Sequence, residues 1–333
     1  MKATRKLMAL VLALVLVFSL GATAFAAAGD YLWTNGGRKL DDTDITAADS
    51  STYVVGDTYA TSATVTLIVE AGDCLDVSSY EVIPNSGFRK EIVNINVTDT
   101  NADDGINGVT VSSLLDTVNG SYGLTFNNVT DPTEAHVYFL ESIATNGHTW
   151  STGNMGLDGW VFRVNDKYPV QRTSDNLGFE GTLLNQTPIH DGDVIHLFFD
   201  MPAELQPGGE SLAANYIRGV LSTKTDSAMT IQLQGQKTWI DQSDYSNMLM
   251  YVYSYENAGA GIAATLYDAA GTQVATTTSA ADGTVTFTGN FAAGTYVVQT
   301  DSSLREIDDE DWADYCNNTF FINTGAYSKI VVE

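Results

Sequence analysis

Oxygen-bearing side chains alternate in one segment of the first half of the chain, at Asp99, Asn101 and Asp103. Alternating carboxylate and amide groups ahead of a glycine are typical of a calcium-binding loop. An EF-hand loop has its glycine at the sixth position and a glutamate at the twelfth. Here Gly105 is the seventh residue and Thr110 the twelfth. Two interpretations stay open: a loop stiffened by calcium, and an ordinary turn rich in Asp, Asn and Gly.

The sequence contains no nucleophile elbow, zinc-binding helix, phosphate-binding loop or Cys-x-x-Cys pair. His190 and His196 flank an Asp-Gly-Asp turn, but their spacing fits neither the helical nor the strand geometry of common metal pairs. We expect a turn histidine and a strand histidine.

The acidic run from Glu306 to Asp311 is either a solvated loop or a cation-bound one. Carboxylates that are neighbours in one loop do not face each other across a cleft, as a catalytic pair would. We therefore expect that the protein has no enzymatic activity and requires no cofactor.

The N-terminus has the pattern of a signal peptide. A basic start precedes the apolar run Leu7 to Leu20, and Ala24-Phe25-Ala26 is a small-x-small cleavage site. A run of 14 residues is short for a membrane span, so we expect cleavage after residue 26 and no membrane insertion afterwards. The protein is then secreted, or held at the cell surface by non-covalent contacts. Its net charge of −26 disfavours nucleic acid as a partner.

Cys74 and Cys316 are the only cysteines. In an oxidising compartment two cysteines are expected to form a disulfide, here one that would join different domains. The alternative is two isolated thiols.

The most informative pattern lies between residues 159 and 199. Apolar residues alternate from Trp160 to Val164, as in a strand with one face in a core. Pro169 is then expected to end pairing within a central strand. A tight Asp-Gly turn at 191–192 opens a second apolar run that ends at Phe199, as a core-facing closing strand would.

Further elements surround this pair. Residues 27–59 are polar and predict a leader segment or an added edge strand. Beyond them the pattern predicts two strands, one amphipathic helix and three strands. Their predicted positions are strands at 65–69 and 93–97, a helix over 110–118, and strands at 137–140, 160–165 and 194–199.

Trp-x-Phe-x-Val-Asn-x-x-x-Pro followed by Asp-Gly-Asp-x-Ile resembles the transcobalamin C-terminal-like β-grasp domains of bacterial secreted proteins. The resemblance covers residues 60–202 and implies a mixed sheet around one helix. It also implies a corrinoid-like or glycan ligand, with Trp160, Tyr168 and Asn165 as candidate binding residues. Trp160 has a second interpretation, as a core residue. The chain departs from the family at Asp166, where glycine is usual, and it has no helical barrel to complete a corrinoid pocket.

Residues 203–225, rich in proline and glycine at their start, predict a linker, with a helical connector over 211–222. From 226 to 333, short strands separated by Asp-Gly and Ala-Gly turns predict a β-sandwich. The stretches 261–268, 282–287 and 294–298 resemble the prealbumin-like and collagen-adhesin B-type repeats of surface proteins. The expected fold is thus mainly β, with one α+β domain (β-grasp) and one immunoglobulin-like or prealbumin-like sandwich.

These observations predict a secreted or cell-surface, non-enzymatic binding protein that recognises a small ligand or glycan through its β-grasp domain. The alternative is a structural or adhesive surface component with protein or wall-polysaccharide partners.

Overall fold

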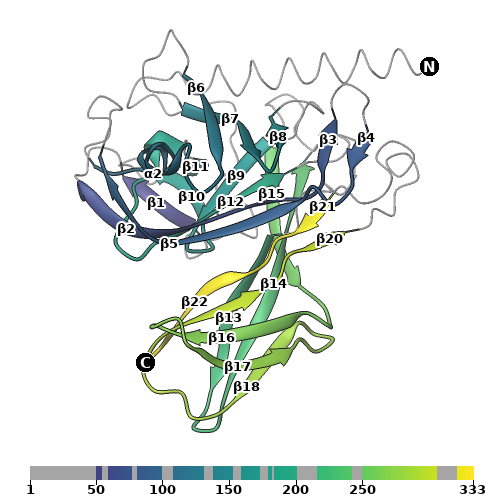
Figure 1. Cartoon of the computed structure of the whole chain (residues 1–333). Helices are drawn as coiled ribbons and strands as arrows, with labels where there is room; N and C mark the ends of the chain where they lie inside the picture. The colour runs from purple at the N-terminus through teal and green to yellow at the C-terminus, as the bar shows by residue number, and fades with distance from the viewer. Residues whose placement is uncertain are drawn as a thin grey trace.

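The computed structural model of the chain describes residues 50–54, 59–76, 81–99, 108–130, 138–152, 159–172, 179–181, 184–200, 216–241, 250–305 and 321–333. The predicted signal peptide, most of the predicted leader, residues 203–215 and the acidic run 306–311 lie outside these ranges. The described part is mainly β, and its few helical residues are concentrated in one short α-helix (Figure 1). No helix within it is long and apolar enough to cross a membrane.

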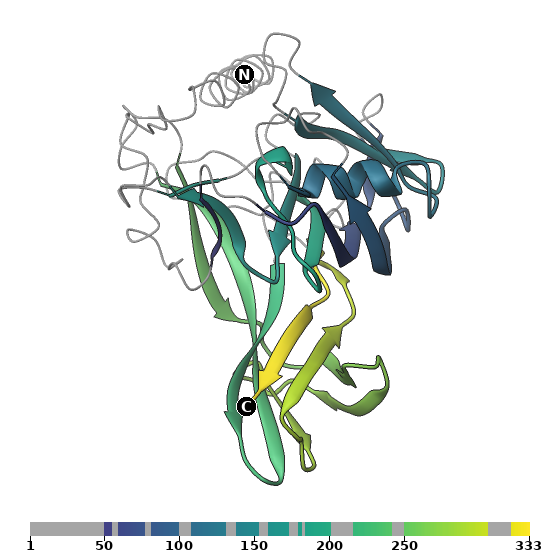
Figure 2. The same cartoon turned by 90° about the vertical axis from the view of Figure 1, so that its left-hand side faces the viewer.

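Buried apolar side chains gather in two large clusters. One spans Ala63 to Phe199, and the other spans Ile217 to Val332. We call the parts of the chain around them the N-terminal body and the C-terminal body. Figures 1 and 2 show the C-terminal body extending away from one side of the N-terminal body as a set of long strands.

A four-stranded mixed sheet forms the floor of the N-terminal body. Its strands are β2 (Ser62–Ala71), β5 (Phe88–Thr98), β9 (Gly159–Val164) and β12 (Val194–Asp200). The order is β5-β2-β12-β9, with β2 and β12 parallel and the two outer pairings antiparallel. Trp160 pairs with Phe199 in the β9–β12 register. The prediction that the tryptophan strand and the strand after the Asp-Gly turn share one sheet is confirmed.

The strand predicted at 93–97 is present, but its inward-facing residues are not those of a strict alternation, which would turn Val93 inward together with Ile95 and Val97. The β2–β5 register shifts between Val65 and Leu67, and Asn94 adopts a φ of 56°. This bulge turns Val93 outward, where 55% of its surface is exposed. Ile92 therefore takes the inward position that the alternating pattern gave to Val93.

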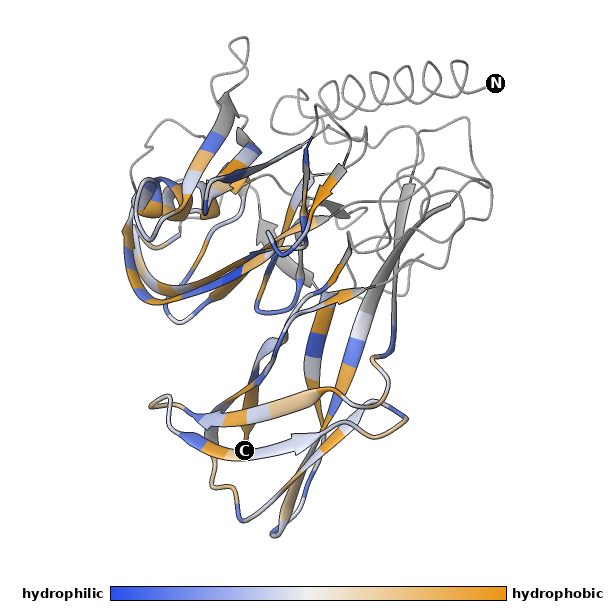
Figure 3. Ribbon diagram, turned by 45° about the vertical axis from the view of Figure 1, so that its right-hand side comes forward, coloured by the Kyte–Doolittle hydropathy of each residue, from blue (hydrophilic) through white to orange (hydrophobic). Residues whose placement is uncertain are grey.

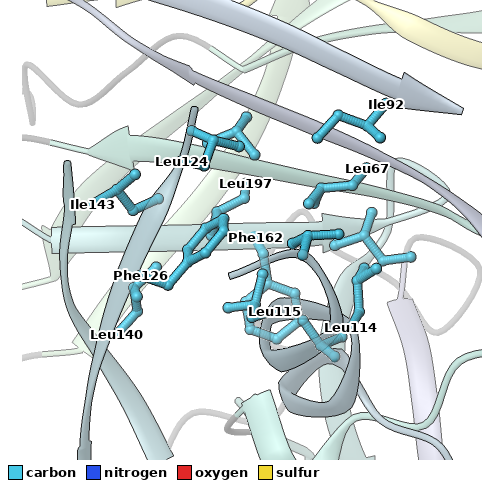
Figure 4. Packing of buried hydrophobic residues seen from close by; sticks show 14 of the residues in the cluster. Leu67, Ile92, Leu114, Leu115, Leu124, Phe126, Leu140, Ile143, Phe162 and Leu197 are labelled. Atoms are coloured by element: carbon cyan, nitrogen blue, oxygen red, sulfur yellow. The ribbon is translucent and has the colours of Figure 1, made fainter. Parts of the chain in front are cut away.

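Helix α2 (Val111–Val118) lies on one face of this sheet, as predicted. Thr110 caps it, and Thr110 and Ser113 form a reciprocal capping box that satisfies two backbone N–H groups at its start. Leu114 and Leu115 are fully buried and face Leu67, Phe162 and Leu197 of the sheet (Figure 4). Figure 3 shows hydrophobic and hydrophilic residues interspersed along β2 and β5.

Smaller sheets complete the N-terminal body. One contains β1 (Ser50–Val54), β10 (Tyr168–Arg172) and β11 (Phe179–Gly181). A second contains β3 (Cys74–Asp76) and β4 (Glu81–Ile83). A third contains β6 (Thr125–Thr130), β7 (Tyr138–Thr145) and β8 (His148–Ser151), with the short helix η3 (Leu184–Gln186) nearby.

The prediction that pairing ends at Pro169 is wrong, because β10 continues to Arg172 in the first of these sheets. Pro169 pairs with Ser51 on one side, while pairing with β11 begins at Val170. Its missing N–H is thus tolerated.

The C-terminal body is built from two sheets around the second core, an arrangement consistent with a β-sandwich. One sheet contains β13 (Tyr216–Lys224), β14 (Ala228–Asp241), β15 (Met250–Asn257) and β18 (Thr284–Thr288). The other has the order β17 (Gln273–Thr278), β16 (Ala263–Asp268), β19 (Gly294–Thr300) and β22 (Tyr327–Val332). A short pair, β20 (Ser303–Arg305) with β21 (Phe321–Asn323), adjoins them.

The predicted linker needs a correction. Residues 216–224 form strand β13, which pairs along its length with β14, so they are neither a linker nor a helical connector. Tyr216, Ile217 and Arg218 are buried in it. β-branched and aromatic residues at this point favour a strand once a neighbouring strand is present to pair with.

Candidate functional site

Both faces of the mixed sheet are buried along its central strand β12 and the second half of β2, whereas outward-facing residues of β5 are exposed. Side chains alternate across a strand, so residues next to the inward-facing Val69, Leu197 and Phe162 point to the opposite face. There Glu70 and His196 are only 0% and 1% exposed. Phe198 on the same face packs with Tyr216 and Ile322 of the C-terminal body in a third apolar cluster. We call this contact zone between the two bodies the seam.

A carboxylate lies at the centre of the seam. Glu70 accepts from Arg89 Nη1 at 3.2 Å, contacts His196 Nε2, and receives the backbone N–H of Gly325 at 3.4 Å. Burial raises the pKa of Glu70, but His196, Arg89 and the Gly325 amide together outweigh burial and hold that pKa below its ordinary value. Glu70 is therefore a buried anion that joins three strands of one body to a loop of the other.

Arg89 adds a second hydrogen bond between the same strands and Gly325, this time as the donor. Its Nη1 donates to the carbonyl of Gly325 at 2.7 Å, while Nη2 pairs with Glu91 at 2.7 Å. A Cβ atom on Gly325 would lie 2.1 Å from Arg89 Nη1 and 2.3 Å from the carbonyl oxygen of Thr300. Only glycine permits so close an approach of the two bodies at this point.

A second polar contact lies beside the first. The hydroxyl of Tyr216 donates to Asp166 Oδ1 at 2.6 Å. Burial raises the pKa of Asp166, against hydrogen bonds from Ser328 and Tyr216, and burial likewise raises the pKa of Tyr216 well above its usual value, with Asp166 adding to the effect. Asp166 lies in the turn after β9 with a φ of 62°, in the left-handed region where glycine is favoured.

Aromatic rings and arginines fill the rest of the seam. Phe198 and Tyr216 stack with centroids 5.1 Å apart and an angle of 28° between their planes. The Arg163 guanidinium lies 5.6 Å from the centroid of each ring. Arg218 lies over Tyr255 at 3.5 Å and donates to Gln234 at 3.0 Å. Two arginines of the seam thus lie against aromatic rings, and a third, Arg89, pairs with the buried Glu70 carboxylate.

Protein encloses the two titratable groups at the centre of the seam. Glu70, His196 and Asp166 resemble an acid–base set by residue type, but the Glu70 and His196 side chains are at most 1% exposed. Their hydrogen bonds go to each other and to neighbouring protein groups. Three of the hydrogen bonds described above run from one body to the other.

Trp160 and Asn165, two of the candidate ligand residues, are used within the N-terminal body. The Trp160 ring packs edge-on against Phe199 at 5.2 Å, and its indole N–H donates to the Trp150 carbonyl at 3.1 Å. Asn165 donates to Asp193 at 2.6 Å and accepts from the Val194 N–H at 3.0 Å. Asn165 therefore joins the two halves of the sequence motif.

Other predicted residues fall partly beyond the described chain. The Tyr168 side chain, Asn101, Asp103 and Cys316 are not described. Asp99 is described, and its backbone N–H donates to Thr61. The described residues hold no cluster of three or more His, Cys, Asp or Glu side chains that would suit a metal ion. The calcium loop and the disulfide both stay predictions.

Cys74 is buried beside Thr149, whose carbonyl its thiol contacts at 3.2 Å. Burial raises the pKa of this thiol to about 11.

The histidine predictions are confirmed, but the seam itself was missed. His196 lies in β12, and His190 is exposed at the turn before it. The available signal was the unbroken apolar run around His196, because a strand covered on both faces lacks polar alternation. A second signal was Asp166 at the position where the resembling family has glycine.

No family model matches the chain, and searches of curated proteins and of solved structures return no match.

Proposed function

We propose that this chain is a secreted or cell-surface, non-enzymatic protein with an adhesive or structural role, whose partners are other proteins or wall polysaccharide. The observation that carries the proposal is the seam, where hydrogen bonds from Arg89 to Gly325, from Gly325 to Glu70 and from Tyr216 to Asp166 run between the two bodies. A rigid pair of β-domains suits a component that presents a surface at a set distance and angle.

In this proposal the N-terminal body is a β-grasp domain. Support comes from the order β5-β2-β12-β9 with its parallel central pair, and from a single helix that follows the second strand and packs on one face. The Trp160 strand and the Asp-Gly-Asp turn, which carry the resemblance to transcobalamin C-terminal-like domains, lie side by side.

The C-terminal body is an immunoglobulin-like or prealbumin-like sandwich in the same proposal. Its two sheets enclose one apolar core, and tight turns with glycines in the left-handed region, Gly271 and Gly283, connect successive strands. This organisation agrees with the resemblance to repeats of surface proteins.

Cell fractionation tests the adhesive role. Antibody detection in washed cells, cell-wall extract and culture medium is expected to find most of the protein with cells or wall. Purified protein is expected to bind isolated wall material, and proteolysed or polysaccharide-stripped wall identifies the kind of partner. Recovery in the medium alone, with no binding to wall or to surface proteins, would contradict this role.

A small-ligand carrier is the second candidate, and the motif resemblance favours it. A corrinoid or glycan would then bind at the edge near Tyr168, since Trp160 and Asn165 already have partners within the domain. Titration with cobalamin, followed by absorbance and calorimetry up to high micromolar concentration, tests the corrinoid form. The absence of a spectral shift and of binding heat would exclude it, and a glycan array tests the other form.

A further inference from the structure

We propose that the seam is an acid-released latch: a proton on the Glu70 carboxylate separates the two bodies, which otherwise stay joined. The inference goes beyond the adhesive role and does not depend on which partner the protein binds.

Glu70 is the control point because several donors converge on it. His196, Arg89 and the Gly325 N–H all direct polar groups at its two oxygens. An ionised carboxylate is an acceptor only, whereas a protonated one carries a hydrogen that needs an acceptor of its own. Protonation therefore weakens the ion pair, within the N-terminal body, that positions Arg89 Nη1 for the Gly325 carbonyl. It also sets the new O–H against the donors that already point at Glu70, among them the Gly325 N–H.

His196 reinforces this dependence. Its Nε2 faces Glu70, while its Nδ1 is buried and has no hydrogen-bond partner in the described chain. If Nε2 carries the hydrogen of the neutral ring, it can accept a proton from Glu70 only when that hydrogen moves to Nδ1. A proton on Glu70 that is shared with Nε2 would thus place the ring hydrogen on Nδ1, where the described chain offers no acceptor, and a buried donor without an acceptor costs free energy.

The charged groups that face Glu70 come from every element packed against it. In the N-terminal body these groups are Arg89 on β5 and His196 on β12. Arg89 also forms an ion pair with Glu91. From the C-terminal side, Tyr216 on β13 lies within electrostatic reach of Glu70.

The neighbouring set around Asp166 is also charged. Arg163 lies over Tyr216, and His196 and Arg218 act electrostatically on Asp166. On β22, Tyr327 lies within electrostatic reach of Glu91 and Arg89.

The pH window follows from the direction of the Glu70 shift. Its pKa in the folded protein lies below the ordinary 4.5, so its contribution is fully present above about pH 4.5 and is lost as the pH falls through the folded pKa. The raised pKa of Asp166 has the opposite sign: its charged form opposes the folded seam, and acid relieves that opposition. Release by acid therefore depends on Glu70 and not on Asp166.

Hydrogen exchange across a pH series tests the latch on the full chain. The reporter is the Gly325 amide, because it donates across the seam to Glu70, and amides of α2 and β19 are internal references. After correction for the intrinsic effect of pH on exchange, acid is expected to speed exchange at Gly325 by roughly ten- to a hundred-fold, the loss expected for hydrogen bonds to a charged group. The reference amides stay protected.

Variants separate the latch from general acid unfolding. Glu70→Gln is expected to expose the Gly325 amide already at neutral pH and to abolish its pH dependence. The matched control is Glu91→Gln, which removes the other carboxylate on Arg89 at a more exposed position and is expected to leave Gly325 protected. Asp166→Asn is expected to keep the acid response.

Three results would overturn the proposal. One is that Gly325 opens only together with the reference amides, which means global unfolding. Another is that Glu70→Gln stays protected at neutral pH, and the third is that Glu91→Gln opens the seam equally. If Glu70→Gln fails to fold, the wild-type pH series alone decides. Wall binding measured at neutral pH tests the adhesive role separately.

Discussion

Tyr216 and Asp166 belong to different bodies of the molecule, and the tyrosine hydroxyl donates to the aspartate carboxylate at 2.6 Å. Asp166 has the positive φ that usually calls for glycine, and the resembling family does have glycine there. A left-handed aspartate costs roughly 1 kcal/mol of backbone strain. Here its side chain reaches the opposite body, so the residue in this strained position also makes a contact between the two bodies.

Removal of the Tyr216 hydroxyl tests that relationship. Tyr216→Phe keeps the stack on Phe198 but leaves the half-buried Asp166 carboxylate with one fewer donor, and we expect a loss of about 1–3 kcal/mol in the free energy of unfolding. Urea denaturation measures it. Tyr296→Phe is the control, because its hydroxyl bonds an exposed carbonyl, and a change within about 0.5 kcal/mol is expected. Equal effects of the two variants would contradict the role of the seam.

Substitution of Gly325 tests whether the two bodies approach each other as closely as the structure shows. Gly325→Ala places a methyl group against Arg89 and the Thr300 carbonyl, and overpacking of this kind costs about 3 kcal/mol. We expect lower stability in thermal unfolding and faster proteolysis between the bodies. At Gly271 nothing lies within 4 Å of an added Cβ, so Gly271→Ala shows only the strain of its φ of 78°. A Gly325→Ala protein as stable as Gly271→Ala would be inconsistent with the geometry.

Asn165 tests how the sequence motif holds its two halves together. Asn165→Gly keeps the φ of 52° without strain but loses the bonds to Asp193 and Val194, and we expect a loss of about 2 kcal/mol. Asn165→Ala adds left-handed strain of roughly 1 kcal/mol. Chemical denaturation of both variants separates the two contributions. Retained stability with lost ligand binding would instead support the predicted ligand role.

Trp160 distinguishes a core residue from a ligand platform. Trp160→Ala removes a ring packed on Phe88 and Phe199, with an expected cost of about 3–5 kcal/mol. Trp160→Phe keeps an aromatic ring but loses the bond to the Trp150 carbonyl, with an expected cost near 1 kcal/mol. Calorimetry gives both values. A platform tryptophan would leave stability nearly unchanged in both.

Local patterns predicted the four strands of the mixed sheet, helix α2 and the start of β7, but not β3, β4, β6, β8, β10 or β11. The helix over 111–118 follows from the spacing of Val111, Leu114 and Leu115 and from a polar cap at Thr110, all of which act within one or two turns. Alternation placed β2 and β9 in the same way. It failed at Val93, because a bulge depends on the register of the partner strand. It also failed at Tyr216–Lys224, where a neighbour had to be present before the strand was evident.

The sequence by itself determined which residues alternate, where the short helix starts, and that Trp160 and Phe199 belong to core-facing strands. Those properties depend on neighbours a few residues apart, whose spacing is fixed by backbone geometry. Only the tertiary structure decided that the second face of the sheet is covered around β12, and that Glu70 meets Gly325 across 255 positions of the chain. A buried carboxylate and a surface carboxylate are the same letters in sequence, because what distinguishes them is which distant backbone excludes the water around them.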